Sequence, residues 1–168
     1  MPDLLVRLYD LPLPGPALER ATEAGFEIRR ALAPEKHVVA RWIRQRFPKA
    51  WESECEIAFS RVPIACFLAI REGRLFGFAA YEATCRNFFG PIGVDESCRG
   101  RSVGGALLLS VLHAMRAEGY AYAIIGDAGA TEFFGRTAGA MPIHGSSPGI
   151  YRGLLRKNKA ERNDGRAE

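Results

Sequence analysis

Hydrophobic residues in the first third of the chain follow first a strand-like and then a helical periodicity. Residues 26–32 alternate in polarity and predict a strand. Between Pro34 and Pro48 the apolar residues recur every three to four positions, which predicts an amphipathic helix bounded by the two prolines. Residues 51–59 place another apolar stripe at helical spacing, so a second, shorter helix is expected there.

Three β-rich runs follow this pair of predicted helices. Residues 65–81 predict a hairpin that turns at Glu72-Gly73, and residues 87–94 predict the next strand of an antiparallel meander. Pro91 lies inside that last strand and cannot donate to a backbone ladder. We therefore expect the strand to be bulged, splayed or at an edge near Pro91.

The second half of the chain alternates helices with strands. Residues 103–117 predict an apolar helix, residues 120–127 a buried strand, residues 130–139 a short helix and residues 148–155 a last strand. A strand, a crossover helix and a second strand imply a parallel pair within an otherwise antiparallel sheet. The expected fold class is therefore α/β (α+β), with a mixed, mostly antiparallel sheet flanked by helices.

Length and composition indicate one globular domain. The chain has 168 residues, of which 48% are hydrophobic and 25% charged. Residues 1–25 contain three closely spaced prolines, and we interpret them as an N-terminal arm or an added edge strand. Residues 26–155 form the predicted domain, and residues 156–168 a flexible polar tail.

Charge and cysteine usage exclude several classes of partner. The net charge is +4, and residues 152–168 hold six basic against three acidic residues, so +3 of it lies in that segment. A nearly neutral body argues against a nucleic-acid partner. The four cysteines form no C-x-x-C pair, which argues against a metal site and a disulfide framework. Since no apolar run has the length of a membrane span or signal peptide, we expect no membrane partner and a cytoplasmic location.

The stretch SCRGRSVGGALL, residues 97–108, places three glycines and two arginines directly before the apolar helix. Glycine lets a ligand approach the backbone closely, and a helix start presents unpaired N–H groups, so an anion such as phosphate is expected there. A P-loop needs Lys-Ser/Thr after its last glycine, whereas Ala106 and Leu107 follow Gly105. The glycine spacing also does not make the G-x-G-x-x-G fingerprint of dinucleotide sites.

The same stretch resembles motif A of the GNAT superfamily of acyl-CoA-dependent N-acetyltransferases. The family pattern is Q/R-x-x-G-x-G/A, with a valine about five residues upstream at the end of a strand. Arg99 and Gly104 begin and end the motif here, and Val94 is the upstream valine. Ser102 stands where the pattern has its first glycine. The resemblance covers residues 26–155 in element order and implies a GNAT-like sheet whose parallel strands splay apart.

This resemblance implies acetyl-CoA as co-substrate and an amine of a small molecule or peptide as acceptor. The pyrophosphate of coenzyme A would lie on the backbone at the start of the helix, and the N–H of Val94 would stabilise the oxyanion that forms when the amine attacks. The implied cofactor-binding residues are Val94, Arg99, Gly100, Arg101, Ser102, Val103, Gly104, Gly105 and Phe134.

The chain departs from the family pattern at both proton-carrying groups. Many members have a glutamate on the strand before the motif, whereas residues 87–94 contain no acid. Many also have a tyrosine general acid where Phe133 and Phe134 stand. The substitutes that we consider are Tyr81, Glu82, Cys85, His144 and Tyr151. We predict Glu82 and Tyr151 as the catalytic pair; catalysis by positioning and the oxyanion donor alone is the alternative.

Two other functions stay open at this point. The chain would serve as a non-catalytic acyl-CoA sensor if the missing glutamate and tyrosine have no substitutes. The run IIGDAGA, residues 124–130, follows a strand and would also suit a nucleotide-binding α/β domain.

The acceptor site and the oligomeric state also stay open. Glu52, Glu54 and Glu56 are either a solvated helix face or one wall of a site for a cationic acceptor. The exposed edges of such a sheet would allow a homodimer.

Overall fold

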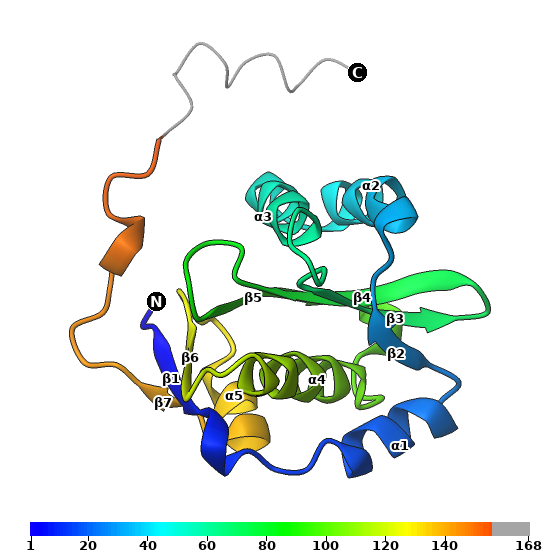
Figure 1. Ribbon diagram of the computed structural model, residues 1–168, viewed down its shortest axis with the longest axis horizontal. Helices are drawn as coiled ribbons and strands as arrows, with labels where there is room; N and C mark the ends of the chain where they lie inside the picture. The colour runs from blue at the N-terminus through cyan, green and yellow to red at the C-terminus, as the bar shows by residue number, and fades with distance from the viewer. Residues whose placement is uncertain (156–168) are drawn as a thin grey trace.

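The computed structural model describes residues 1–155, and seven strands of this part of the chain form one sheet (Figure 1). The strand order is β2-β3-β4-β5-β6-β1-β7. Only the β5–β6 pair is parallel among the pairs of this sheet, so the predicted mixed, mostly antiparallel sheet is confirmed. The strands are β1 (Leu4–Arg7), β2 (Glu27–Arg30), β3 (Cys66–Arg71), β4 (Arg74–Tyr81), β5 (Phe88–Val94), β6 (Tyr122–Ile125) and β7 (Met141–Pro142).

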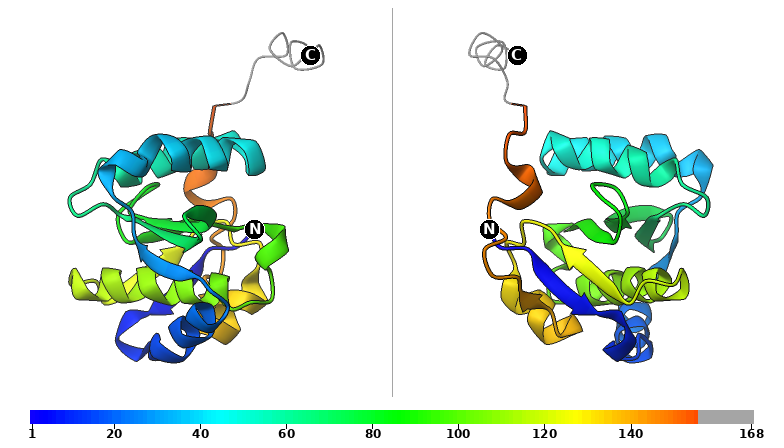
Figure 2. Two further views of the ribbon diagram at one scale, coloured as in Figure 1. Left: turned by 90° about the vertical axis from the view of Figure 1, so that its right-hand side faces the viewer. Right: turned by 60° about the vertical axis from the view of Figure 1, so that its left-hand side comes forward.

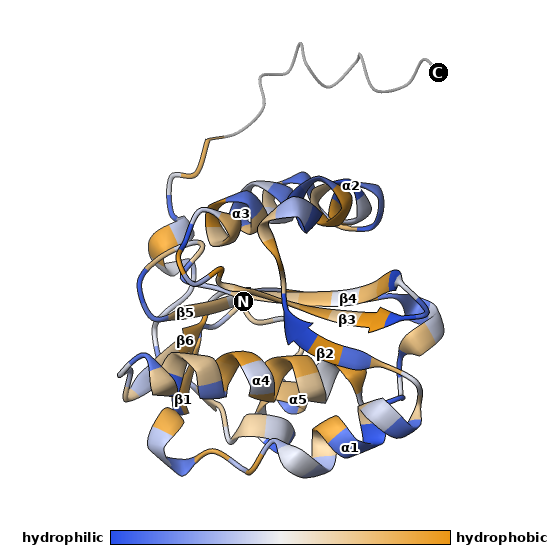
Figure 3. Cartoon of the chain, turned by 45° about the vertical axis from the view of Figure 1, so that its right-hand side comes forward, coloured by the Kyte–Doolittle hydropathy of each residue, from blue (hydrophilic) through white to orange (hydrophobic). Residues whose placement is uncertain are grey.

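Helices cover both faces of the sheet (Figures 1 and 2). On one face lie α2 (Lys36–Arg46) and α3 (Lys49–Phe59), and on the other lie α1 (Gly15–Glu23) and α4 (Val103–Ala117). Helix α5 (Thr131–Ala138) follows β6. Figure 3 shows hydrophobic residues gathered on α4 and the central strands, and both hydrophobic and hydrophilic residues on α1.

Helix α4 forms the centre of the core because it is apolar on most of its circumference. Leu107, Leu108, Val111, Leu112 and Met115 are completely buried. Burial of each such side chain contributes about 1.5–3 kcal/mol relative to leaving it exposed. The helix is therefore held firmly under the sheet, and its first turn has a defined position next to the end of β5.

The N-terminal segment is built differently from the predicted arm or edge strand. Strand β1 lies between β6 and β7, where Leu4 pairs with Ile125 and Leu5 with Met141. Helix α1 also forms within residues 1–25, because Pro16 lies in its first turn, where a missing N–H costs nothing. The division into domains stays a prediction, and residues 156–168 lie outside the described part of the chain.

The strand predicted over residues 148–155 is not formed. The structure has a single 3-10 turn, η4 (Gly149–Tyr151), and Gly149 and Gly153 adopt positive φ angles of 57° and 83°. Such angles are incompatible with a regular strand. The N-terminal strand β1 supplies the partner that β6 needs on that side.

An aromatic cluster fixes the α2–α3 corner on the sheet next to β5. Phe47 and Trp51 stack with ring centroids 5.1 Å apart, and Phe78 of β4 meets Phe47 edge-on at 5.9 Å. Gly93 of β5 pairs with Phe78 and lies directly under the Phe47 ring. A glycine is required there because a Cβ would lie 2.6 Å from the ring carbon Cζ of Phe47.

We expect Gly93→Ala to lower the free energy of unfolding by about 1–3 kcal/mol, because the methyl group overpacks the Phe47–Trp51 stack. Chemical denaturation of both proteins measures the change. Gly15→Ala is the control, since no atom lies within 4 Å of its Cβ position and the residue begins α1. A Gly93→Ala protein as stable as this control would contradict the packing described.

Candidate functional site

A cavity of about 1450 Å³ lies where β5 and β6 part. The two strands pair only at Phe88–Ile124 and Phe89–Ile125, after which β5 continues to Val94 without a partner on that side. Pro91, Ile92 and Val94 of this unpaired stretch line the cavity, and so does Ile125. The splay that Pro91 predicts is therefore present in the fold.

The backbone of β5 turns free N–H groups toward this cavity. In a strand, the N–H and C=O of one residue point to the same side, and consecutive residues point to opposite sides. The N–H of Asp95 donates to the carbonyl of Phe76 at 2.8 Å, on the β4 side. Because the direction alternates, the N–H groups of Val94 and Ile92 point away from β4, toward the gap left by β6.

A bulge in the β4–β5 pairing creates this direction. Ahead of it, the carbonyl of Asn87 accepts from Ile124 on the β6 side at 2.9 Å, so odd-numbered residues face β6 there. The register shifts between Ala79 and Tyr81, opposite Gly90 and Pro91. Beyond the shift even-numbered residues face the gap, because the extra residue reverses the alternation.

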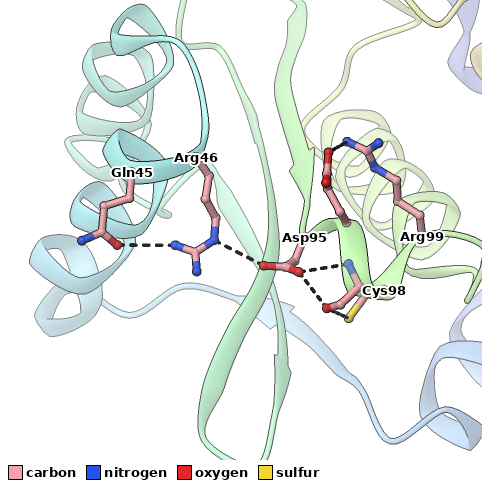
Figure 4. Close-up of polar contacts among 7 residues, drawn as sticks. Gln45, Arg46, Asp95, Cys98 and Arg99 are labelled. Atoms are coloured by element: carbon pink, nitrogen blue, oxygen red, sulfur yellow. Dashed lines mark hydrogen bonds and ion pairs between the residues drawn. The ribbon is translucent and has the colours of Figure 1, made fainter. Parts of the chain in front are cut away.

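A hydrogen-bonded turn connects β5 to α4 at one end of the cavity (Figure 4). The Asp95 carboxylate accepts from the backbone N–H of Ser97 at 3.1 Å and from its hydroxyl at 2.7 Å. Arg46, at the end of α2, donates to the same carboxylate at 3.3 Å. The Ser97 hydroxyl, then its N–H and Arg46, hold the pKa of Asp95 below its usual range. These bonds fix the turn against the helical layer above it.

Two residues of the turn adopt the left-handed backbone conformation. Gly100 has a φ of 77° and Ser102, the N-cap of α4, a φ of 61°. A glycine is the usual residue for such angles, which is a physical reason for the glycine that the family pattern has at the position of Ser102. Ser102 keeps the conformation and adds a hydroxyl, which accepts a hydrogen bond from Nε of Arg20 at 3.1 Å.

Arg20 is a residue that the sequence analysis did not identify. It belongs to α1, inside the predicted arm, and reaches a residue 82 positions later in the chain. No periodicity or motif connects two positions so far apart. The contact brings a guanidinium next to the first turn of α4.

The glycines of the turn leave space rather than fill a tight contact. A Cβ on Gly104 would come no closer than 3.5 Å to Phe133, and one on Gly105 no closer than 3.7 Å to Thr137. Gly100 has no atom within 4 Å of its Cβ position. The positive φ of Gly100 is reason enough for a glycine there. At Gly104 and Gly105 protein packing does not require glycine, and the space would let a ligand come close to the helix N-terminus.

The structure brings most of the predicted site residues to this one cavity. Two of the predicted residues, Arg101 and Glu82, do not line it. Those that do are Val94, Arg99, Gly100, Ser102, Val103, Gly104, Gly105, Phe134 and Tyr151.

Glu82 is a buried carboxylate with partners of its own. Its side chain is 1% exposed and lies 3.1 Å from Nη1 of Arg61. It also accepts a hydrogen bond from the backbone N–H of Asn87, and its φ is 58°. These contacts hold the turn between β4 and β5, and they leave the predicted catalytic role of Glu82 without a route to the cavity.

Tyr151 lies at the opposite end of the cavity from α4, near the start of β5. Its hydroxyl packs on Gly126, beside the ring of Phe88. Burial, and then the negative charge of Glu54, raise the pKa of Tyr151 to about 12. Tyr151 therefore keeps its proton at neutral pH and has one to donate.

Glu54 of α3 lines the same end of the cavity. Its carboxylate accepts a hydrogen bond from the hydroxyl of Thr84 in the β4–β5 turn. Arg99 lines the other end of the cavity, beside the first turn of α4. The cavity thus has a cationic end at α4 and an acidic end at α3.

Residues 1–155 contain no group of three His, Cys, Asp or Glu side chains that could bind a metal ion. All four cysteines in this range are free. Among the same residues, no helix has the length and apolar character needed to cross a membrane.

We expect Glu82→Gln to lower the free energy of unfolding by about 1–3 kcal/mol, because the buried charged hydrogen bonds to Arg61 and Asn87 are lost. Ligand binding at the cavity should not change. Denaturation and ligand-induced melting shifts measure the two effects. Unchanged stability with a large loss of turnover would instead give Glu82 a catalytic role.

Comparison with known proteins relates this chain to one family. Residues 36–140 match the model of the acetyltransferase (GNAT) family. A search among curated proteins finds no match.

Solved structures with the same fold include three acetyltransferases or acetyltransferase regions. A glucosamine N-acetyltransferase region of a fungal multi-domain GH3 β-N-acetylglucosaminidase superposes with a TM-score of 0.69 at 14% identity, over 84% of this chain and 19% of that one. The GCN5-related N-acetyltransferase from Sphaerobacter thermophilus superposes with a TM-score of 0.59 at 17% identity, over 84% of this chain and 48% of that one. The one from Kribbella flavida superposes with a TM-score of 0.52 at 18% identity, over 84% of this chain and 53% of that one.

These structures are longer, and the chain spans between about a fifth and about half of their lengths. At such identities the likeness concerns the fold alone. The family model, in contrast, covers more than half of the sequence and includes β5, the turn and α4. This chain therefore belongs to the GNAT acetyltransferase family.

Proposed function

We propose that the protein transfers an acetyl group from acetyl-CoA to an amine of a small molecule or peptide, by direct attack in a ternary complex. The observation that carries this proposal is the open edge of β5. Its free N–H groups face a cavity that runs to the N-terminus of α4. A long co-substrate with a phosphate end and an amide-rich arm fits this combination.

The turn before α4 is the proposed cradle for the pyrophosphate of coenzyme A. The backbone N–H groups of residues 102–105 and the helix dipole favour negative charge there. Those of Arg99 and Arg101 already donate to the carbonyls of Glu96 and Cys98. Within the described residues the Arg99 side chain forms one ion pair, with the exposed Glu96 at 3.4 Å, so its charge is available to a phosphate. Arg101 is exposed and would act through its charge at longer range.

Acetyl-CoA supplies a thioester, whose carbonyl oxygen becomes negatively charged during attack by the amine. The N–H groups of Val94 and Ile92 both point into the gap. That of Val94 lies next to the cradle and would bind the arm, whereas that of Ile92 is nearer the start of β5, where Tyr151 lies, and is the proposed donor to this oxygen. A donor fixed by the strand stabilises the charge without reorganisation, which in other enzymes is worth about 10²- to 10³-fold in rate. Phe134 would pack against the thioester arm.

Tyr151 is the proposed donor of a proton to the departing thiolate. It is the one tyrosine among the described residues that lines the cavity. Its raised pKa means that it carries its proton at neutral pH, the state that a donor needs. Many family members use a tyrosine as the proton donor at the positions of Phe133 and Phe134. We propose that Tyr151 takes that role here.

The cytoplasmic location expected from the sequence belongs to this proposal, as does the possible homodimer. The sheet ends in β2 and β7, and their outer edges have no strand partner within the described sheet. An edge of this kind would admit a second copy of the chain.

At one hundred times its Kd, acetyl-CoA should add about 2.7 kcal/mol to the free energy of unfolding of the wild type. Its melting temperature should rise accordingly. Gly104→Glu should abolish the shift, because a carboxylate in the first turn of α4 repels the pyrophosphate. The substitution should preserve the fold, since acidic residues are favourable at a helix N-terminus. Gly104→Ala is the control for the added Cβ, which meets only ordinary contacts.

An equal shift in the wild type and the Gly104→Glu protein would refute the proposed cradle. A shift with ATP or NAD but not with acetyl-CoA would favour a nucleotide-binding domain instead. Binding of acetyl-CoA without release of CoA over a broad amine panel would favour the acyl-CoA sensor.

We expect Tyr151→Phe to lower kcat by about 10²- to 10⁴-fold through loss of the proton donor. The KM for acetyl-CoA should change little, because Tyr151 lies at the end of the cavity away from the cradle. Steady-state release of CoA measures both constants. A variant with unchanged kcat would place the proton transfer elsewhere.

A further inference from the structure

The three glutamates of α3 have different surroundings. Glu52 is bound by Arg44, and Glu56 lies 3.8 Å from Nζ of Lys36. Glu54 forms no ion pair within the described residues and lies in the wall of the cavity. A carboxylate that is partly shielded from water and lacks a counter-charge is stabilised when a cation binds beside it.

The position of Glu54 along β5 places it beyond the end of the proposed thioester arm. The Thr84 hydroxyl donates to Glu54, and the next residue, Cys85, accepts from the N–H of Phe88 at 3.3 Å. Phe88 begins β5, whereas the cradle follows its last residue. Tyr151 packs beside the same Phe88 ring. Glu54 and Tyr151 therefore approach one stretch of β5 from two different elements.

Asp127 is the other acid that lines the cavity. Its carboxylate lies 2.6 Å from the amino group of Met1. The remaining titratable groups around this end are Cys85, in the β4–β5 turn, and Tyr151, on η4. The cation among these groups, the Met1 amino group, is paired with Asp127, and no ion pair to Glu54 forms within the described residues. An ammonium ligand would supply the counter-charge that Glu54 lacks.

We propose that Glu54 binds the ammonium group of a cationic acceptor and takes the proton that the nitrogen loses as it becomes nucleophilic. This inference rests on the proposed acetyl transfer. It assigns the general base to Glu54 of α3, because β5 has no acidic residue. The acceptor is then an amine that is protonated in solution. Its body is apolar, because Trp51, Phe89, Ile150 and Leu154 also line the cavity.

Glu54 and Tyr151 together account for every proton that moves in the reaction. One ammonium proton passes to Glu54 and from there to solvent. The nitrogen lone pair then forms the C–N bond, and the C–S bond breaks with its electron pair going to sulfur. Tyr151 gives its proton to the thiolate and regains one from the nitrogen as the amide forms. The products are the N-acetyl amide, free CoA and one proton.

The test compares Glu54→Gln with Glu56→Gln, a matched change two residues along α3 at a position that does not line the cavity. With acetyl-CoA and n-hexylamine at pH 7, Glu54→Gln should lower kcat/KM by about 10²- to 10⁴-fold. Glu56→Gln should leave it within twofold. The loss should shrink toward pH 10, where an alkylamine with a pKa of about 10.4 supplies its own free base.

A second measurement separates this inference from the proposed function. In the presence of CoA, hexylamine should raise the melting temperature of the wild type more than hexan-1-ol does, and Glu54→Gln should remove the difference. Acetyl-CoA should stabilise the wild type and both variants equally. If no amine releases CoA, acetyl transfer fails, and this binding comparison still decides whether Glu54 holds an ammonium group.

Two results would overturn the role of Glu54. One is a Glu54→Gln protein as active as Glu56→Gln toward an amine that the wild type acetylates. The other is an equal melting shift of the wild type by hexylamine and hexan-1-ol. A loss of activity in Glu54→Gln that stays constant from pH 7 to pH 10 would limit Glu54 to a structural contact with Thr84.

Discussion

The separation of β5 from β6 is the constraint on which the site depends. Both strands need backbone partners, and they satisfy each other only at Phe88–Phe89 and Ile124–Ile125. From there β5 keeps β4 on one side and has an open edge on the other. An open edge inside a domain leaves N–H groups without protein partners, and such groups are costly unless water or a ligand satisfies them. The bulge at Gly90-Pro91 decides which N–H groups these are.

The rest of the fold holds this open edge in place. Helix α4 is buried on most sides, so its first turn has a fixed position after β5. The Phe47–Trp51 stack fixes the α2–α3 corner over Gly93, and Arg46 ties that corner to Asp95 in the turn. Glu54 thereby has a defined place above the start of β5. The two faces of the sheet thus contribute separately, with the proposed phosphate cradle at α4 and an acidic wall from α3.

The sequence was most informative where a local pattern has one physical cause. Pro91 predicts a strand that cannot be fully paired, and glycines before an apolar helix predict an anion site. Ser102 shows the same logic, because its positive φ is the backbone state for which the motif normally uses glycine. The incomplete pairing of β5 and the backbone state of residue 102 were predictable because each depends on a few neighbouring residues, and the anion site stays a prediction.

Features that depend on distant contacts were missed or misplaced. Whether β1 or residues 148–155 would pair with β6 was decided by long-range competition, which local propensity does not report. Tyr151 reaches the cavity from a turn rather than from the predicted strand. Glu82 is close in sequence to β5 but faces Arg61, and the choice among the three glutamates of α3 required knowing where Arg44 and Lys36 lie.

Amide hydrogen exchange at Ile92 and Val94, followed with and without acetyl-CoA, tests the central claim most directly. If the open edge of β5 binds the co-substrate, both amides exchange readily in the free protein and become protected when acetyl-CoA is added, while Gly93, which faces β4, is protected in both states. Protection of Ile92 and Val94 in the free protein, or exchange unchanged by saturating acetyl-CoA, would contradict the account.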